Sequence, residues 1–206
     1  MFEPFQNQFN ETLRIENIPV EMKGIPFKYS ELLLACGGKT YNNGLYTIHT
    51  FEESVKWTQI LKSYFPFLGY DFISFGHDWL GRQFCVPVGV GEHILVFDPT
   101  TQHEGHIETN LIDFHNDFLL ENKEEFFLVD YWKQILDHIG AEEVPRNKCL
   151  GFKVSMFVGG EEEITNYDLF DLEVYWDFEH QIFQQVSALP PGTKVNKVVI
   201  NPFTKI

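Results

Sequence analysis

The sequence predicts an α+β fold in which a twisted, mainly antiparallel sheet is covered by packed helices. Two runs, at 70–76 and 83–88, are rich in aromatic and β-branched residues, and a polar turn separates them, which is typical of a β-hairpin. A third run at 94–97 continues the pattern as the next strand of a meander. Apolar positions near helical spacing at 52–64 and 124–139 supply helices to pack on this sheet.

Composition indicates one densely packed domain. The chain has 206 residues, 44% of them hydrophobic and including 21 Phe, and a disordered chain lacks the apolar area that offsets the entropy of ordering. A chain of this length buries most of its apolar surface in one sizeable core. We expect an irregular or partly helical N-terminal arm at 1–29, which has no sustained period, and a single α+β domain at 30–206.

Turn-forming and capping residues mark the expected elements of the first half, because glycine, proline, asparagine and serine favour the ends of helices and strands. A meander is the simplest topology that connects these elements. In chain order, the sequence predicts a short helix capped by Ser30 and stopped by Gly37–Gly38, an Asn43–Gly44 turn with positive φ, a strand at 45–48, a helix from Glu52 to Pro66, and a strand break at Asp98–Pro99.

The second half is expected to contain the clearest helix of the chain, at 124–139. Its apolar residues step at helical intervals, and Gly140 follows where a C-terminal stop belongs. A shorter helix is expected just before it, at 113–121. Alternation in Leu172–Trp176 predicts a half-buried strand. Helical spacing then returns at Ile182, Phe183 and Val186, and a turn is expected at 190–192.

The charge of the chain indicates what it binds. A formal net charge of −15 repels nucleic acid and anionic membranes and attracts basic surfaces, and no concentrated Lys/Arg patch is visible. Between Val154 and Thr193 there are eight acidic residues and no Lys or Arg. We therefore expect a continuous acidic surface in the second half, a basic protein partner, and no nucleic-acid or membrane partner.

Three cysteines, Cys36, Cys85 and Cys149, are too few and too scattered for a disulfide framework or a thiolate metal site. An odd number of cysteines fits a reducing compartment. The apolar run at 32–36 is far too short to span a bilayer, and the N-terminus has no basic leader region. The sequence therefore predicts a soluble, cytoplasmic protein.

A histidine-rich segment has the residue types of a metal site. A zinc helix of the HExxH kind needs two histidines four positions apart on one face, whereas here they are three apart around a glycine and follow a strand-ending proline. The sequence therefore favours a hairpin turn here, and we expect no metal or other cofactor. The residues concerned are His103, Glu104, Gly105 and His106, with Glu108, Asp113 and His115 nearby.

The turn after the first hairpin strand offers an acid–base pair, because the carboxylate of Asp78 can raise the pKa of His77. A structural interpretation is stronger. Asp78 can accept backbone N–H groups inside the turn, Trp79 can cover the edge of the core, and Gly81 can adopt a backbone angle closed to other residues. No nucleophile with a paired base is discernible, and we predict no catalytic residue.

Four ordered blocks carry a resemblance to a known family. They are Asp78-Trp79-Leu80-Gly81-Arg82-Gln83-Phe84, Ile94-Leu95-Val96-Phe97-Asp98-Pro99, Leu172-Glu173-Val174-Tyr175-Trp176 and Leu189-Pro190-Pro191-Gly192-Thr193-Lys194. Their order and spacing resemble the bacterial immunity proteins paired with type VI secretion DNase effectors, which carry a GAD-like region followed by a C-terminal immunity domain. These proteins are similar in turn to the SUKH superfamily. The resemblance runs from about Leu32 to about Val199 and implies a SUKH-like fold.

The resemblance implies a non-enzymatic inhibitor that binds a cognate toxin, most often a nuclease, made by the same cell. A DNase presents basic residues to its phosphate substrate, so an inhibitor gains from carboxylates set opposite them. Charge alone selects the candidate toxin-binding residues. They are Glu161, Glu162, Glu163, Asp168 and Asp171, with Asp78 and Arg82 as second choices.

Two other functions stay open. SUKH-like domains also serve as interaction parts outside toxin systems, so the chain can be a regulatory or scaffolding module. It can also be a metal-dependent hydrolase that uses His77 and Asp78 or the segment from His103 to His115. The sequence does not separate a direct block of the toxin's cleft from binding elsewhere, and it leaves the oligomeric state open.

Overall fold

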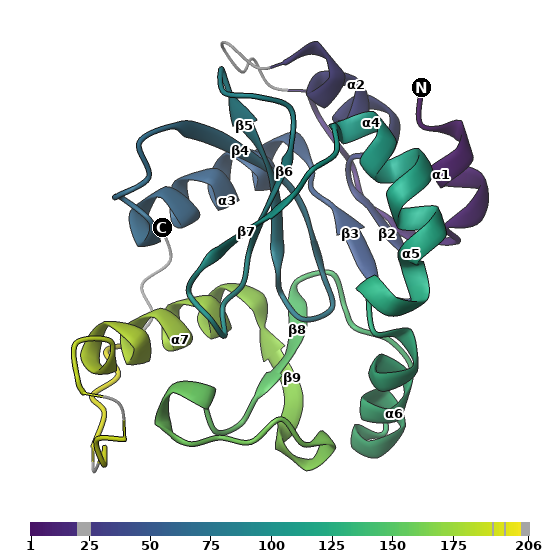
Figure 1. Ribbon diagram of the computed structural model, residues 1–206. Helices are drawn as coiled ribbons and strands as arrows, with labels where there is room; N and C mark the ends of the chain where they lie inside the picture. Colours follow the sequence, from purple (N-terminus) through teal and green to yellow (C-terminus); the bar gives the residue numbers. More distant parts are fainter. Residues whose placement is uncertain (20–25, 191, 196, 203–206) are drawn as a thin grey trace.

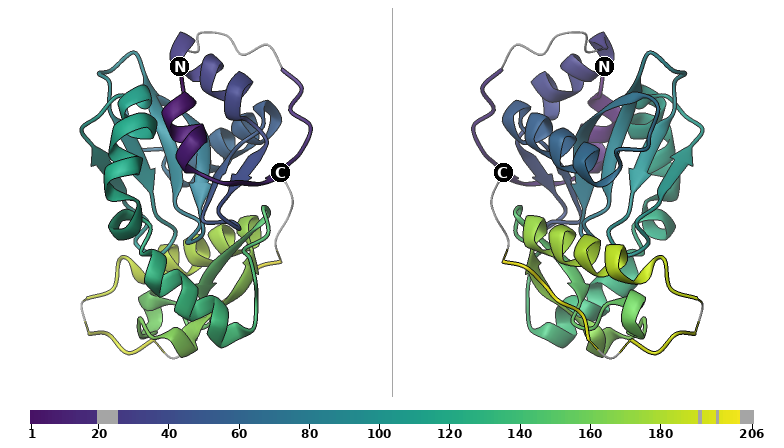
Figure 2. Two further views of the ribbon diagram at one scale, coloured as in Figure 1. Left: turned by 90° about the vertical axis from the view of Figure 1, so that its right-hand side faces the viewer. Right: turned by 90° about the vertical axis from the view of Figure 1, so that its left-hand side faces the viewer.

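A seven-stranded antiparallel sheet organises the protein, with helices on both of its faces (Figure 1). The structure is a computed structural model that describes residues 1–19, 26–190, 192–195 and 197–202. A smaller two-stranded sheet lies with α6 and α7 at one end of the large sheet (Figures 1 and 2). The predicted α+β class, with a mainly antiparallel sheet and packed helices, is confirmed.

The large sheet is a meander, as predicted, because each strand pairs with the next strand along the chain. The predicted hairpin and the strand at 94–97 are both confirmed. The strands are β1 (Glu11–Arg14), β2 (Lys39–Tyr41), β3 (Tyr46–Ile48), β4 (Asp71–Asp78), β5 (Gln83–Val88), β6 (Ile94–Phe97) and β7 (Glu104–Ile107), and the small sheet contains β8 (Lys148–Phe152) and β9 (Tyr167–Asp171).

Helices α4 and α5 lie on one face of the large sheet and α3 on the other, so the sheet is the middle of three layers (Figure 2). A π-helical turn at Phe114–Phe118 joins α4 to α5. The helices are α1 (Glu3–Gln8), α2 (Phe27–Cys36), α3 (Phe51–Tyr64), α4 (Leu111–Asp113), α5 (Leu119–Phe126), α6 (Val129–Ile139) and α7 (Leu172–Val186), with 3-10 turns at Met156–Val158 and Ile164–Asn166.

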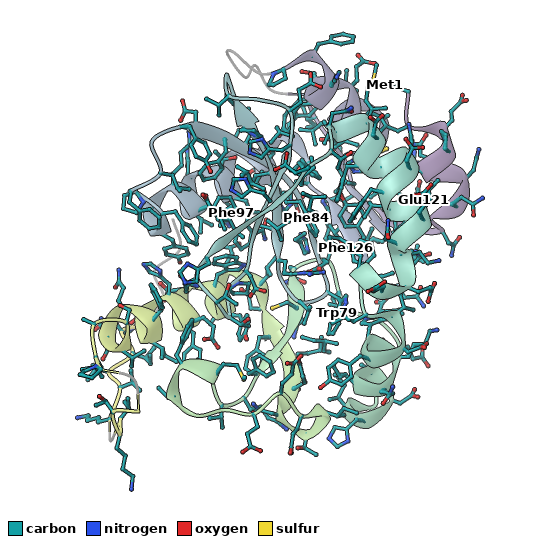
Figure 3. The ribbon with its side chains drawn as sticks, viewed as in Figure 1. Met1, Trp79, Phe84, Phe97, Glu121 and Phe126 are labelled. Carbon is teal, nitrogen blue, oxygen red and sulfur yellow. The ribbon has the colours of Figure 1, made fainter. Side chains whose placement is uncertain are left out.

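Both faces of the sheet are buried, which explains the aromatic content of the chain. Along β6, Ile94 packs into one apolar core, whereas Leu95 and Phe97 pack into the other, as the two-residue repeat of a strand requires. The first core includes Phe84 and Phe126, whose ring centroids are 5.9 Å apart, and Figure 3 shows Phe97 lying away from them. The second core joins α3 and α7 to the sheet.

The first residues of the chain are part of the main sheet. Segment 3–8 forms α1, and 11–14 forms β1, which pairs with β2 at the edge of the sheet. The side chains of Phe2, Phe5 and Phe9 are buried in the first core. Residues 20–25 of the expected N-terminal arm lie outside the described residues. The predicted cap at Ser30 is wrong, because α2 begins at Phe27 after Pro26.

The single helix predicted at 124–139 is wrong, because α5 ends at Phe126 and α6 begins at Val129. Between them, Leu128 has a left-handed φ of +50°. Two backbone carbonyls at the break bind side chains of the β4–β5 turn: the indole of Trp79 donates to Phe127 O, and Arg82 donates to Phe126 O. These two hydrogen bonds satisfy carbonyls at the end of α5 and so stabilise the break. The predicted stop at Gly140 is confirmed by its φ of +70°.

Two further predictions are corrected. The strand predicted at Leu172–Trp176 is wrong, because this segment is the first part of α7. The Asp171 carboxylate accepts the N–H groups of Glu173 and Val174 and so caps the helix. The histidine segment, expected in a hairpin turn, forms strand β7, which pairs with β6. The helical spacing predicted from Ile182 onward is confirmed.

We predict that Leu128→Gly is more stable than Leu128→Ala by about 1 kcal/mol, because a left-handed backbone costs about 1–2 kcal/mol for residues other than glycine. Both variants remove the same half-exposed side chain, so their difference isolates the backbone. Urea unfolding of the two variants measures it. Equal stability would show that the break between α5 and α6 stores no backbone strain.

Candidate functional site

The turn between β4 and β5 is built around the Asp78 carboxylate, which is wholly buried. One carboxylate oxygen accepts the backbone N–H groups of Leu80 (3.1 Å) and Arg82 (3.0 Å), and the other accepts from the Arg82 side chain at 2.6 Å. Burial raises the pKa of Asp78, and Arg82 opposes this rise. The predicted structural role of Asp78 is confirmed.

The same turn joins the large sheet to the rest of the protein. Trp79 is wholly buried, and its indole N–H donates to Phe127 O at 2.6 Å. Its carbonyl accepts from the backbone N–H of Leu150 in β8 at 2.7 Å. Trp176 of α7 donates to the carbonyl of Gly81 at 2.8 Å. Figure 3 shows Trp79 between the large sheet and the smaller one. The β4–β5 turn is therefore a structural junction between the two sheets.

Gly81 is required in this turn for two reasons. Its φ is +78°, as predicted, and a Cβ atom there would lie 3.0 Å from Leu172 and 3.3 Å from Cys149.

Asp78 and Arg82, the second choices for toxin binding, hold each other inside the turn through their ion pair. Because the Asp78 side chain is wholly buried, the exposed acidic surface consists of other residues.

The first-choice acidic residues are all exposed and belong to the unit formed by β8 and β9. Glu161, Glu162 and Glu163 lie in the loop that precedes the second 3-10 turn, and Asp168 and Asp171 lie in β9. We call these five residues the acidic surface. Asp171 has a second role as the cap of α7.

The backbone of the acidic loop is held in place by Asn166. Its amide nitrogen donates to the carbonyls of Val154 (3.0 Å) and Glu161 (2.9 Å), and its amide oxygen accepts from Val154 N–H (2.9 Å). The backbone N–H of Glu163 also donates to Glu161 O at 2.9 Å. The carboxylates therefore project from an ordered loop, a feature that sequence analysis did not predict.

The histidines once considered for metal binding are separated by the fold. His115 is wholly buried: Nδ1 donates to Leu111 O at 2.8 Å, Nε2 accepts from the Tyr46 hydroxyl at 3.1 Å, and burial lowers the pKa to about 4. His106 lies on exposed β7 and stacks on His93, with ring centroids 4.9 Å apart. Within the described ranges, no group of three or more Cys, His, Asp or Glu side chains is arranged to hold a metal ion.

All three cysteines are buried thiols. Cys85 packs in the second core, and burial raises the pKa of all three thiols above the usual range. A thiol with a raised pKa is a weak nucleophile at neutral pH, because the thiolate is the reactive form.

A polar cavity of about 320 Å³ beside α3, which we call the α3 pocket, was not predicted. Its base contains His49 and His77, both almost completely buried, and Trp57. Its rim contains Glu16, Glu52 and Glu173. A capping box formed by Thr50 and Glu53 starts α3 and is visible in the sequence. Arg146, which lines one wall of the pocket, is 93 residues away from Glu53, so no local sequence pattern indicates their contact.

Arg146 fixes one wall of the α3 pocket through an ion pair with Glu53. Its guanidinium also donates to the carbonyls of Lys39 (3.2 Å) and Ile48 (2.6 Å). Burial opposes ionisation of Glu53, but Arg146 and the other groups around the carboxylate outweigh it and lower its pKa to about 2. This wall is therefore charged, internally paired and rigid.

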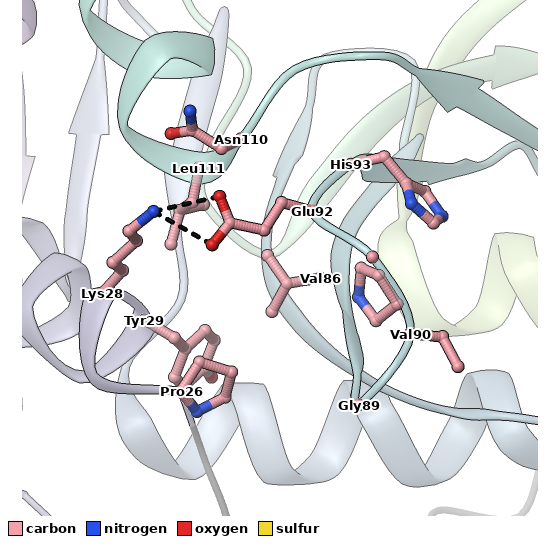
Figure 4. A pocket seen from close by; sticks show the side chains of 12 residues that line it. Pro26, Lys28, Tyr29, Val86, Gly89, Val90, Glu92, His93, Asn110 and Leu111 are labelled. Atoms are coloured by element: carbon pink, nitrogen blue, oxygen red, sulfur yellow. Dashed lines mark hydrogen bonds and ion pairs between the residues drawn. The ribbon is translucent and has the colours of Figure 1, made fainter.

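A second cavity, of about 180 Å³, lies between α2 and the β5–β6 loop (Figure 4). Tyr29, Val86 and Leu111 give it an apolar lining. The Lys28 ammonium lies 3.1 Å from the Glu92 carboxylate, and this ion pair crosses the cavity in Figure 4. No pattern in the sequence indicates this cavity.

Comparisons with known proteins support the fold. No family model matches the chain, and no curated protein matches it significantly. Among solved structures, the chain is similar to one described as the crystal structure of Atu4351 from Agrobacterium tumefaciens, with a TM-score of 0.64, 14% sequence identity, and coverage of 88% of this chain and 89% of that chain. At this identity the likeness concerns the fold alone. In the part of the chain that the structure describes, no helix is long and apolar enough to cross a membrane.

We predict that Asp78→Ala lowers the free energy of unfolding by about 3 kcal/mol, because it leaves Arg82 and two turn N–H groups without their buried acceptor. Asp168→Ala is the matched control, since it removes an exposed carboxylate and should change stability by less than about 0.5 kcal/mol. Chemical denaturation of both variants measures the effect. If the two variants were equally stable, the turn would not depend on Asp78.

Glu179 of α7 links stability to pH. Its side chain is wholly buried and accepts from the Ser155 hydroxyl at 2.6 Å, and burial raises its pKa from the ordinary 4.5 to about 7. The folded state therefore binds a proton more readily than the unfolded state, so the contribution of Glu179 to stability is lost as pH rises from about 4.5 to about 7.

We expect Glu179→Gln to gain stability relative to the wild type as pH rises from 5 to 8. The change should be of the order of 3 kcal/mol, since one pKa unit corresponds to about 1.4 kcal/mol. The buried histidines titrate in an overlapping range but are present in both proteins, so the difference isolates Glu179. Urea unfolding at several pH values measures it, and a pH-independent difference would contradict the raised pKa.

Proposed function

We propose that this chain is a cytoplasmic immunity protein that binds a cognate antibacterial toxin with a basic surface, a secreted nuclease, and neutralises it by association. The observation that carries the proposal is the acidic surface, five exposed carboxylates on one ordered unit of the fold. The resemblance of the four sequence blocks to immunity proteins of type VI secretion DNase effectors gives the class of partner.

The electrostatics of the acidic surface support a basic partner. The chain carries a net charge of −15, and the segment between Val154 and Thr193 contains eight acidic residues and no Lys or Arg. Basic residues from elsewhere face only part of this segment: Lys56 pairs with Glu173, and Lys148 lies opposite Asp171. A nuclease needs basic residues to bind phosphates, so the two surfaces attract each other. Such attraction raises the association rate and orients the partners, while a few buried anchors supply most of the affinity.

The rigidity of the acidic loop also supports binding. Asn166 holds the backbone at Val154 and Glu161, so the carboxylates of 161–163 start from fixed positions. An ordered loop loses less conformational entropy on binding than a disordered one, which leaves more of the interaction energy as affinity. A complex of standard size buries about 1,600 Å², more than the acidic surface alone offers, so its neighbours are expected to contribute.

A survival assay tests the proposal. The chain is co-expressed in a tester bacterium with the effector encoded beside its gene, and survivors are counted against an effector-only control. We expect survival to be restored and the two proteins to purify together. Death of the cells despite soluble expression of this chain would overturn that pairing and favour a regulatory or scaffolding role.

The triple variant Glu161→Gln, Glu162→Gln and Glu163→Gln should slow association with the effector by about tenfold at low salt and much less at high salt, because steering by charge is screened. Stopped-flow binding measures this. The matched control neutralises three exposed acids of α1 and of the segment around α4, which lie at the other end of the molecule from β8 and β9 (Figure 1). They are Glu3→Gln with Glu108→Gln and Asp117→Asn. Equal rates for the two triple variants would exclude the acidic loop as the steering surface.

A further inference from the structure

Two glutamines of α7 hold a C-terminal segment of the chain by its backbone (Figure 2). The side-chain amide of Gln185 accepts from the N–H of Val199 at 3.0 Å and donates to the Val199 carbonyl at 2.9 Å. The amide of Gln181 accepts from the N–H of Asn201 at 2.7 Å and donates to the Asn201 carbonyl at 3.3 Å. Each glutamine therefore binds both backbone groups of one residue, as a residue in a neighbouring strand does.

The spacing of the two glutamines matches an extended peptide. Residues four positions apart on a helix are separated by a rise of about 6 Å. Alternate residues of an extended chain are separated by about 6.6 Å and direct their N–H and C=O groups to the same side. Gln185 binds Val199 and Gln181 binds Asn201, so the segment runs antiparallel to α7. The pair thus has the geometry to bind the backbone of an extended segment in this direction.

Backbone hydrogen bonds, and not side-chain packing, hold the segment. The four residues from Val199 to Pro202 are all exposed, and 55% of Val199 and 40% of Ile200 are accessible. These residues bury little apolar area, which is the main source of affinity in most protein association. A segment that adds side-chain contacts to the same backbone hydrogen bonds would bind more tightly. Residues 199–201 are therefore a replaceable occupant of the site.

Charge indicates what kind of segment fits. Residues 187–206, which include the bound segment, contain three lysines and no Asp or Glu, whereas 154–186 contain eight acidic residues and no Lys or Arg. Asp177 lies one turn before Gln181 on α7 and accepts from the Gln181 amide at 2.6 Å. A segment that continues past Gln181 toward the start of α7 therefore approaches the Asp177 carboxylate, which favours a basic side chain.

We propose that α7 is a binding site for an extended basic segment of a protein partner, which takes the place of residues 199–201 of this chain. Gln181 and Gln185 bind the backbone of the segment, and main-chain hydrogen bonds supply affinity as they do when a peptide adds to the edge of a sheet. Asp177 attracts a basic side chain of the same segment. The site does not depend on the partner being a toxin, so it stands or falls apart from the function proposed above.

A second copy of this chain is a less favourable occupant. The linker at 187–198 connects α7 to the bound segment. A short linker keeps the chain's own segment at an effective concentration of the order of 1 mM. The same segment from a second copy forms the same contacts, so it competes only when the protein approaches that concentration. A partner segment with additional contacts competes at lower concentrations.

Hydrogen exchange followed by NMR tests whether the glutamines hold the segment in the full chain. We expect the N–H groups of Val199 and Asn201 to be protected at least about fivefold more than that of Ile200, which an extended chain directs away from α7. An unstructured peptide of the same sequence supplies the reference rates. Equal protection of the three N–H groups would overturn the site.

Two pairs of substitutions assign this protection to particular side chains. Gln181→Ala with Gln185→Ala should remove the difference in exchange. Gln134→Ala with Gln184→Ala, which are also exposed on helices, is the matched control and should preserve it. Loss of protection in both pairs would contradict a specific role of Gln181 and Gln185.

A peptide tests whether the site accepts a segment from another molecule. Val199→Pro with Asn201→Pro in the full chain removes both N–H donors of the resident segment and so frees the site. A capped peptide with the sequence of residues 197–202 is then added, and NMR follows the side-chain amides of Gln181 and Gln185. We expect both signals to shift at millimolar peptide, and the wild type to need at least about tenfold more because its own segment competes. Unmoved signals in the proline variant would overturn the proposal.

Methylated peptides test the register. Methylation of the backbone nitrogen at the position of Val199 or Asn201 removes a donor and should weaken binding at least about fivefold. Methylation at the position of Ile200 should leave binding within about twofold. If all three peptides bound equally, the backbone would not be the group that α7 binds.

Longer peptides test the preference for a basic segment. One carries Lys and the other Glu directly after the residue that corresponds to Pro202, so that the charge lies toward Asp177. We expect the Lys peptide to bind several-fold more tightly at low salt, and Asp177→Asn to remove most of this difference. Equal binding of the two peptides would overturn the choice of a basic partner. Wild-type dimers at micromolar concentration that vanish in the proline variant would instead identify a second copy as the occupant.

Discussion

The arrangement of this protein depends on the buried carboxylate of Asp78. It fixes the β4–β5 turn by accepting two backbone N–H groups and the Arg82 side chain. From this turn, Trp79 forms hydrogen bonds with the α5–α6 break and with β8, and the carbonyl of Gly81 accepts a hydrogen bond from Trp176. The turn is thus one of the contacts that attach the small sheet, which carries the acidic surface, to the large sheet, and a buried charge pair of this kind is costly to break.

Burial of both faces of the large sheet determines where the charges lie. Apolar side chains from alternate strand positions fill two cores, so most carboxylates are left on the surface. Two enclosed carboxylates differ in their pKa. The partly buried Glu53 is paired with Arg146 and has a lowered pKa, whereas the wholly buried Glu179 has a raised pKa because its neighbours do not offset burial. The carboxylates of the acidic surface are therefore exposed, whereas Glu53 in the α3 pocket is paired within the protein.

Local signals in the sequence predicted much of the sheet and little of the long-range packing. The strands at 83–88 and 94–97, and the Asp78 turn, are specified by alternation and by turn residues within a few positions. The break at Leu128 depends on side chains from a turn more than forty residues earlier, and the α3 pocket depends on Arg146 meeting Glu53. The segment at 172–176 alternates like a strand, but capping by Asp171 makes it a helix. Charge alone predicts the exposed acids. It does not predict that Asn166 holds the backbone of their loop in place.

Hydrogen–deuterium exchange of the complex with its cognate effector tests the central claim most directly, because it maps the contact surface without any substitution. The account predicts that binding slows exchange in the segment from 161 to 173. Protection confined to α1, α4 and α5, with unchanged exchange at 161–173, would contradict it and place the partner on the opposite part of the molecule.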